Sequence, residues 1–109
     1  MSEVLLQGLL PGSAGAIAAL PNLVPKLHMK MYALYQAGKI DEAMKLQAQL
    51  GQGDWATKQA GEIGAMKSLI SKHFGYGESH VRRPLMAVSQ LSGSYVDKLE
   101  ELIASEMTL

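Results

Sequence analysis

The stretch Pro11-Gly-Ser-Ala-Gly-Ala-Ile-Ala-Ala-Leu-Pro-Asn-Leu-Val-Pro25 decides the fold of this chain. It carries no charge, and its run Ala16–Leu20 has no polar side chain. A short apolar run bounded by glycine and proline is typical of a strand buried on both faces. The stretch therefore predicts a glycine turn, a buried strand over 16–19, a tight turn and a helix. On pattern alone, small residues in a helical hairpin explain it equally well.

Outside this stretch, apolar side chains recur at the three- and four-residue spacing of helices that bury one face. A short helical piece over Ser2–Leu10 is apolar on nearly every side, so it is expected to have neighbours all round. Helix start signals place N-caps at Asn22, Asp41 and Ser94. The spacing and these signals predict four longer helices, over Leu23–Ala37, Asp41–Gln59, Glu62–Phe74 and Ser94–Met107.

Glycines lie at the end of one predicted helix and in the middle of another. Gly38 is expected to end the first of the four as a C′ glycine. Gly51 and Gly53 are expected to weaken the second helix in its middle, where Asp54 is able to recap a continuation. The helix over Asp41–Gln59 is therefore predicted either as continuous or as broken at 51–53.

The charged and titratable residues of these helices are expected on the solvent side. His28 and His73 are interpreted as helix-surface residues rather than metal ligands, because neither has a cysteine or a pair of carboxylates beside it. In the last helix, three glutamates are expected to face water: Glu100, Glu101 and Glu106.

The pattern as a whole predicts a mostly α protein with four to five helices and at most one short strand. A strand cannot stand alone, because its backbone N–H and C=O groups would have no partners. The N-terminal helical piece, apolar all round, also has too few partners here. The first quarter of the chain is therefore expected to need neighbours that these residues do not supply.

Composition excludes several classes of function. The 109 residues suffice for one small domain, and 10 Lys and Arg balance 10 Asp and Glu, so no basic face for nucleic acid is expected. Without cysteine there is no disulfide, no thiolate nucleophile and no cysteine metal site. The apolar N-terminal region has no basic residues before it and is interrupted by prolines, so neither a secretory signal nor a membrane span is predicted. We expect a cytoplasmic protein.

No motif of the sequence signals catalysis strongly. Gly12-Ser-Ala-Gly15 lacks both the lysine of a phosphate-binding loop and the dinucleotide spacing. Arg82-Arg83 is interpreted as pairing with a nearby helix end rather than as an anion site. The three histidines lie far apart, and no metal site is predicted.

One helical pattern suggests an alternative function. Ala33-Leu-Tyr35 followed by Gly38-Lys-Ile-Asp-Glu-Ala43 is similar to the join between the two helices of a tetratricopeptide repeat. Such repeats bind peptides and occur in arrays, whereas this pattern occurs once. A non-catalytic helical module for protein interaction is therefore kept as the alternative.

The order of several short motifs resembles the C-terminal third of the dihydrodipicolinate synthase / N-acetylneuraminate lyase family. Each piece is weak, but their order and spacing together are specific and cover essentially the whole chain. The residues around the predicted strand and after the third long helix are most similar to those of fungal members. The matching pieces are Gly15-Ala-Ile-Ala, Asn22, Pro25, Ala37-Gly38-Lys39, Asp41-Glu-Ala43, Leu46-Gln47, Lys67-Ser-Leu-Ile, Phe74-Gly75 and Arg82-Arg-Pro-Leu85.

This resemblance implies a fragment of a (β/α)8 barrel, a fold that takes about 250 residues. Residues 1–37 would supply the last barrel strand with its flanking helices, and residues 38–109 a C-terminal helical extension. Ala18 departs from the family, which often has serine at that position.

The resemblance also implies a chemistry. Family enzymes are class I aldolases or lyases, in which a buried lysine forms a Schiff base with pyruvate or a 2-keto acid and a tyrosine relays a proton, without a cofactor or metal. Neither that lysine nor that tyrosine has a counterpart here, so this chain alone is expected to be inactive. Ile17 matches the family position that lies against bound pyruvate, mainly through its backbone; as a residue of barrel core it is explained equally well. A homo-oligomer is expected for the complete enzyme.

Overall fold

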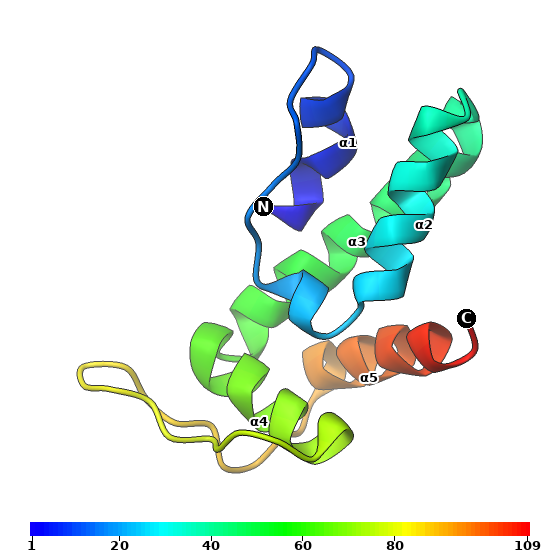
Figure 1. Ribbon diagram of the computed structural model, residues 1–109. Helices are drawn as coiled ribbons and strands as arrows, with labels where there is room; N and C mark the ends of the chain where they lie inside the picture. Colours follow the sequence, from blue (N-terminus) through cyan, green and yellow to red (C-terminus); the bar gives the residue numbers. More distant parts are fainter.

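The computed structural model describes residues 1–109, and every regular element in it is helical (Figure 1). The mostly α class expected from the sequence is confirmed. In chain order the elements are η1 (Ser2–Val4) and α1 (Leu5–Leu9), η2 (Leu20–Asn22), α2 (Pro25–Gln36), α3 (Ile40–Ala60), α4 (Glu62–Phe74) and α5 (Ser94–Met107), of which η1 and η2 are single 3-10 turns.

The long helix α3 is the centre of the molecule. It runs diagonally through the fold, and α2, α4, α5 and η1 all contact it (Figure 1). Its Leu50 is fully buried, in one hydrophobic core with Leu20 of η2, Met31 of α2 and Leu99 of α5. The core thus draws on both predicted units, 1–37 and 38–109, and their division as parts of a barrel stays a prediction.

Helix α2 ends as expected at Gly38. This glycine has a φ of 73°, which favours glycine over residues with a Cβ. Its N–H donates to the Tyr35 carbonyl at 3.0 Å, and the Lys39 N–H donates to the Leu34 carbonyl at 2.9 Å. These two bonds form a Schellman motif, which satisfies carbonyls that the helix end would otherwise leave free.

The three predicted N-caps are wrong. Asn22 lies in η2, where its side-chain amide donates to the Ala19 carbonyl at 2.9 Å, and α2 begins only at Pro25. The reason is that Leu20, Leu23 and Val24 are buried, which fixes a 3-10 turn ahead of the helix. Asp41 and Ser94 lie inside the first turns of α3 and α5, and neither helix has a side-chain cap hydrogen bond.

Helix α3 is unbroken at Gly51 and Gly53, so the continuous form of the predicted helix is the one found. A Cβ on Gly53 would lie 2.6 Å from Leu102 Cδ2 and 3.2 Å from Leu20 Cδ2, closer than ordinary packing allows. Gly53 therefore lets η2 and α5 approach the helix axis, and burial between them compensates the poor helix propensity of glycine.

Replacing these two glycines by alanine is expected to have opposite effects. Gly53→Ala should lower the free energy of unfolding by about 1 to 3 kcal/mol, the usual cost of overpacking a close contact. Gly51→Ala should raise it by up to about 1 kcal/mol, because alanine is the better helix former and a Cβ there meets the Glu3 backbone at an ordinary 3.8 Å. Urea unfolding followed by circular dichroism measures both. Shifts of equal sign would contradict the close packing at Gly53.

A long loop, residues 75–93, projects from the end of α4 and returns to α5 (Figure 1). It is held on α4 near Gly64, where a Cβ would lie 2.5 Å from the Met86 carbonyl oxygen, and by a hydrogen bond from the Ser68 hydroxyl to the Val88 carbonyl. Arg82 and Arg83 are exposed on this loop and bond to no helix end, so the pairing expected for them is not found.

None of the helices combines the length and the apolar character that crossing a bilayer would require.

Candidate functional site

The segment around Ile17 lies open on the surface. Ile17 is 96% exposed, and the backbone N–H groups of residues 14–19 and C=O groups of residues 16–18 make no hydrogen bond. The strand predicted over 16–19 is therefore not formed, because a strand needs a neighbour that pairs with its backbone. What the structure presents is an apolar segment with unpaired backbone. The assignment of Ile17 as a pyruvate contact stays a prediction.

A groove of about 700 Å3 lies beside this segment. Residues 17–19 form one wall, and Ile63, Met66 and Ile70 of α4 contribute apolar side chains. Ile63 is 51% exposed. The face of α4 that carries it therefore opens onto the groove, with the predicted site residue at the edge.

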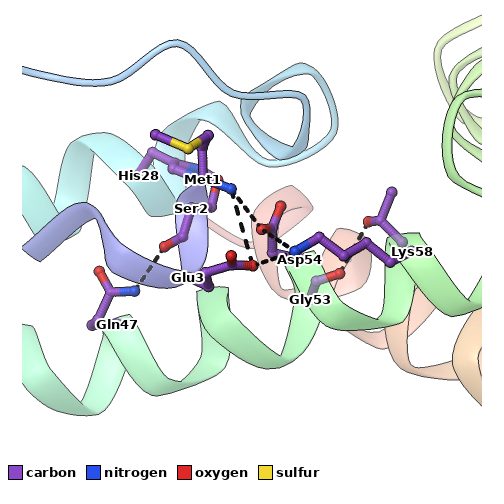
Figure 2. A network of polar contacts seen from close by, with 9 residues as sticks. Met1, Ser2, Glu3, His28, Gln47, Gly53, Asp54 and Lys58 are labelled. Atoms are coloured by element: carbon purple, nitrogen blue, oxygen red, sulfur yellow. Dashed lines mark hydrogen bonds and ion pairs between the residues drawn. The ribbon is translucent and has the colours of Figure 1, made fainter.

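Charged residues border the same groove near the start of α1 (Figure 2). The Asp54 carboxylate, almost fully buried, lies 2.8 Å from the Met1 ammonium and 3.9 Å from Lys58 Nζ. Glu3 pairs with Lys58 at 2.8 Å. Burial alone would raise the pKa of Asp54, but its hydrogen bonds and the two neighbouring cations hold that pKa below its usual value.

A second, neutral network joins η1 to α2 and α3 (Figure 2). His28 Nδ1 lies 2.7 Å from the Val24 carbonyl oxygen, and its Nε2 lies 2.8 Å from Ser2 Oγ. The carbonyl can only accept, so Nδ1 carries the proton and Nε2 accepts from the Ser2 hydroxyl. Gln47 Nε2 donates to the Ser2 carbonyl at 2.7 Å. All buried polar side-chain atoms are satisfied.

His28 is thus a buried residue, and its expected place on the helix surface is wrong. It is 7% exposed because η1, which packs on the middle of α3, also covers the start of α2, where Ser2 contacts His28. No pattern within α2 reveals this burial, since the covering element lies elsewhere in the chain. Burial lowers the pKa of His28 below its ordinary 6.5, while the Val24 carbonyl and the charges of Glu106 and Asp54 oppose that shift.

This depressed pKa predicts a loss of stability in mild acid. The unfolded chain binds a proton at His28 near pH 6.5, whereas the folded chain resists it, so stability is full above that pH and falls as the pH drops through 6.5 toward the folded pKa. Urea midpoints measured between pH 8 and 5 should therefore decrease on the acid side. The slope should flatten in His28→Gln but not in His80→Gln, which alters an exposed histidine. An unchanged slope in His28→Gln would contradict this account.

Three further titratable side chains, Lys72, His73 and Glu100, lie together at the surface between α4 and α5. His73 Nε2 lies 3.3 Å from Glu100, which also accepts a hydrogen bond from Lys72; that bond is the main reason why the pKa of Glu100 is below its usual value. His80 is exposed on the long loop. No three His, Asp or Glu side chains come together in an arrangement that would hold a metal ion.

Glu106 is the polar residue that sequence reasoning misplaced most. It was expected to face water, but it is 3% exposed. Its Oε1 accepts from the Lys26 N–H at 2.8 Å and its Oε2 from the Leu27 N–H at 2.9 Å. The sequence held one signal: Glu106 falls at helical spacing from Leu99 and Leu102, on the apolar face of α5.

Comparison with known proteins decides the family. A model of the dihydrodipicolinate synthetase family matches residues 1–104. The chain belongs to this family. The helix junction that suggested a tetratricopeptide repeat, residues 33–43, lies inside the match.

Curated relatives in this family are fungal aldolases. An L-threo-3-deoxy-hexylosonate aldolase of Hypocrea jecorina is 39% identical over 110 residues, covering all of this chain and 34% of the relative. A similarly named aldolase of Aspergillus niger is 32% identical over 110 residues, covering all of this chain and 32% of that protein. A probable mitochondrial 4-hydroxy-2-oxoglutarate aldolase of Emericella nidulans is 39% identical over 84 residues, covering 77% of this chain and 26% of the relative.

The chain thus spans about a third of the length of the curated relatives it matches, and it corresponds to their C-terminal portion. No solved structure shows a significant match.

Proposed function

We propose that this chain is the C-terminal part of a pyruvate-dependent class I aldolase, in which residues 15–19 form the last barrel strand. The observation that carries the proposal is the unpaired backbone of the segment around Ile17, in a chain that belongs to this family and matches the C-terminal portion of aldolases. In a closed barrel, the first and seventh strands would pair with the two edges of this segment. The apolar groove beside it would then be covered by the rest of the barrel.

The substrate class follows from the names of the relatives, which act on a deoxy sugar acid and on 4-hydroxy-2-oxoglutarate. For a 4-hydroxy-2-oxo acid, a lysine amine condenses with the C2 keto group and releases water. The C3–C4 bond then breaks, its electrons pass into the iminium, and the C4 hydroxyl proton goes to a base as the aldehyde leaves. Protonation of the enamine and hydrolysis give pyruvate and restore the lysine.

In this scheme the residues of this chain bind the substrate and shape its site, and none of them takes part in the covalent steps. Ile17 would contact the three-carbon part of the substrate mainly through its backbone, and the branched side chain would fill the barrel interior. The small residues Gly15, Ala16 and Ala18 would leave room for the ligand beside the strand. The Schiff-base lysine and the tyrosine would come from the part of the enzyme outside these residues.

A chimera tests the proposal. The 110 residues of the Hypocrea jecorina aldolase that align with this chain are replaced by it, and pyruvate release from the 2-oxo acid is followed. We expect activity in the chimera and none in the same relative cut before those residues. Ile17→Pro should abolish activity, because proline removes a backbone donor from the strand, whereas Ile17→Val should keep it. A folded chimera without activity, or an active Ile17→Pro variant, would overturn the proposal.

The isolated chain is expected to self-associate, because its open groove presents apolar side chains that the rest of a barrel would cover. Ile17 at 96%, Met1 at 58% and Ile63 at 51% are the most exposed of these side chains. Light scattering should give a mass that rises above the monomer value with concentration. The double variant Ile17→Lys, Ile63→Lys should remain nearer the monomer mass, whereas the control Met29→Lys, which alters an exposed residue outside the groove, should not. A monomer at every concentration would contradict this expectation.

A further inference from the structure

We propose that Glu106 is a positioning residue: by holding the N-terminus of α2 it sets the place of the segment that carries Ile17. This inference rests on the proposed function, because it concerns the same site. Glu106 lies 79 and 80 residues from its two hydrogen-bond partners, so it joins the last helix of the chain to the first long one.

Glu106 satisfies two of the backbone N–H groups in the first turn of α2. Helix α2 begins with Pro25, which has no N–H to satisfy. The next two N–H groups, of Lys26 and Leu27, donate to the two oxygens of Glu106, and the His28 N–H reaches the Val24 carbonyl at 3.4 Å. No side chain near α2 in sequence caps it. The carboxylate also lies at the positive end of the helix dipole, where an acidic side chain stabilises a helix.

Helix α5 also holds residues 20–27 through a second contact, made by Leu102. Leu102, one helical turn before Glu106, packs against α3 at Gly53, and Leu20 of η2 packs at the same glycine. Leu20 is fully buried, and its carbonyl accepts from the Val24 N–H at 3.1 Å. Residues 20–27 are therefore fixed at one end by the Leu20–Gly53–Leu102 contact and at the other by Glu106.

The segment before Leu20 depends on these two points. Residues 14–19 donate no backbone hydrogen bond, and the last hydrogen bond on the N-terminal side of Ile17 runs from the Ser13 hydroxyl to the Gly15 carbonyl at 3.0 Å. The direction in which the chain leaves Leu20 is then set by η2 and the start of α2. Loss of the Glu106 contacts should move the Ile17 backbone without touching any reacting group, and should weaken substrate binding rather than the chemical step.

The isolated chain gives the first test, with Glu106→Gln compared with Glu101→Gln, an exposed residue of the same helix. Amide hydrogen exchange of Lys26 and Leu27 should become roughly tenfold faster in Glu106→Gln, as expected for a weakened charge-assisted bond. The NMR shifts of residues 16–20 should change as well, and neither effect should appear in Glu101→Gln. Faster exchange with unchanged shifts at 16–20 would show a simple helix cap and overturn the proposal. If Glu106→Gln does not fold, Glu106→Asp, which keeps the charge but shortens the reach, takes its place.

The chimera described above gives the second test. Glu106→Gln should raise KM about threefold to tenfold, the usual range for one lost binding contact, with kcat nearly unchanged. A loss of kcat at constant KM would contradict a positioning role. If the unmodified chimera folds but makes no product, the proposed function fails, and the shifts of residues 16–20 in the isolated chain still decide whether Glu106 positions the segment.

Discussion

Treatment of this chain with pyruvate and borohydride is expected to leave its mass unchanged. A Schiff-base lysine must be partly neutral near pH 7, which requires burial or neighbouring cations. All but one of the lysines are exposed, and the exception, Lys67, is half-buried and donates to the His80 carbonyl. Lys58 pairs with Glu3, which raises its pKa and favours the unreactive ammonium. No lysine lies on the segment around Ile17.

Mass spectrometry after reduction measures the outcome directly. The Hypocrea jecorina aldolase, treated in parallel, serves as the positive control and should gain one pyruvyl group if the Schiff-base scheme holds for this family. A stoichiometric adduct on one lysine of the isolated chain would contradict both the placement of the Schiff-base lysine outside these residues and the description of the Ile17 surroundings as part of a larger site. It would place the reactive lysine inside these residues, and it would make the surroundings of Ile17 a complete site.

The largest effect on stability is expected for Leu50→Ala. Leu50 is fully buried in α3, the helix that contacts the other long helices. Removing three carbons there should cost about 3 to 5 kcal/mol, from lost burial and from the cavity left behind. The free energy of unfolding of a domain is about 5 to 15 kcal/mol, so the variant should be close to unfolding at 37 °C.

Thermal unfolding by calorimetry or circular dichroism measures this loss. The matched control is Met44→Ala on the same helix, where the side chain is 51% exposed and a change within about 0.5 kcal/mol is expected. If both variants unfold at the same temperature as the parent chain, α3 is not the centre of the core in solution.

Much of the fold was predictable because the signals for helices are local. The spacing of apolar residues gave α4 and α5 with their observed bounds, Glu62–Phe74 and Ser94–Met107. Gly38 was predicted as the end of α2, and it has a positive φ there. These features depend on residues within a turn or two of each other, which is the range that a sequence pattern describes.

The family, too, could be inferred from the order of short motifs, and the match over residues 1–104 confirms it. The position of Ile17 as a site residue came only from that resemblance and stays a prediction. The groove beside it was not foreseen, because its walls come from residues 17–19 and from α4, which lie about half the chain apart.

What the sequence by itself determined is therefore where most helices lie and which family the chain belongs to. Local pattern placed His28 on the surface, Gly53 where it weakens its helix and Glu106 facing solvent. Only the tertiary structure decided the roles of these three residues. Each is buried by an element distant in sequence: His28 by η1, Gly53 by η2 and α5, and Glu106 by the start of α2. A buried polar group or a mid-helix glycine is stable only when such a partner supplies its hydrogen bonds or fills its space, and helical periodicity carries no information about that partner.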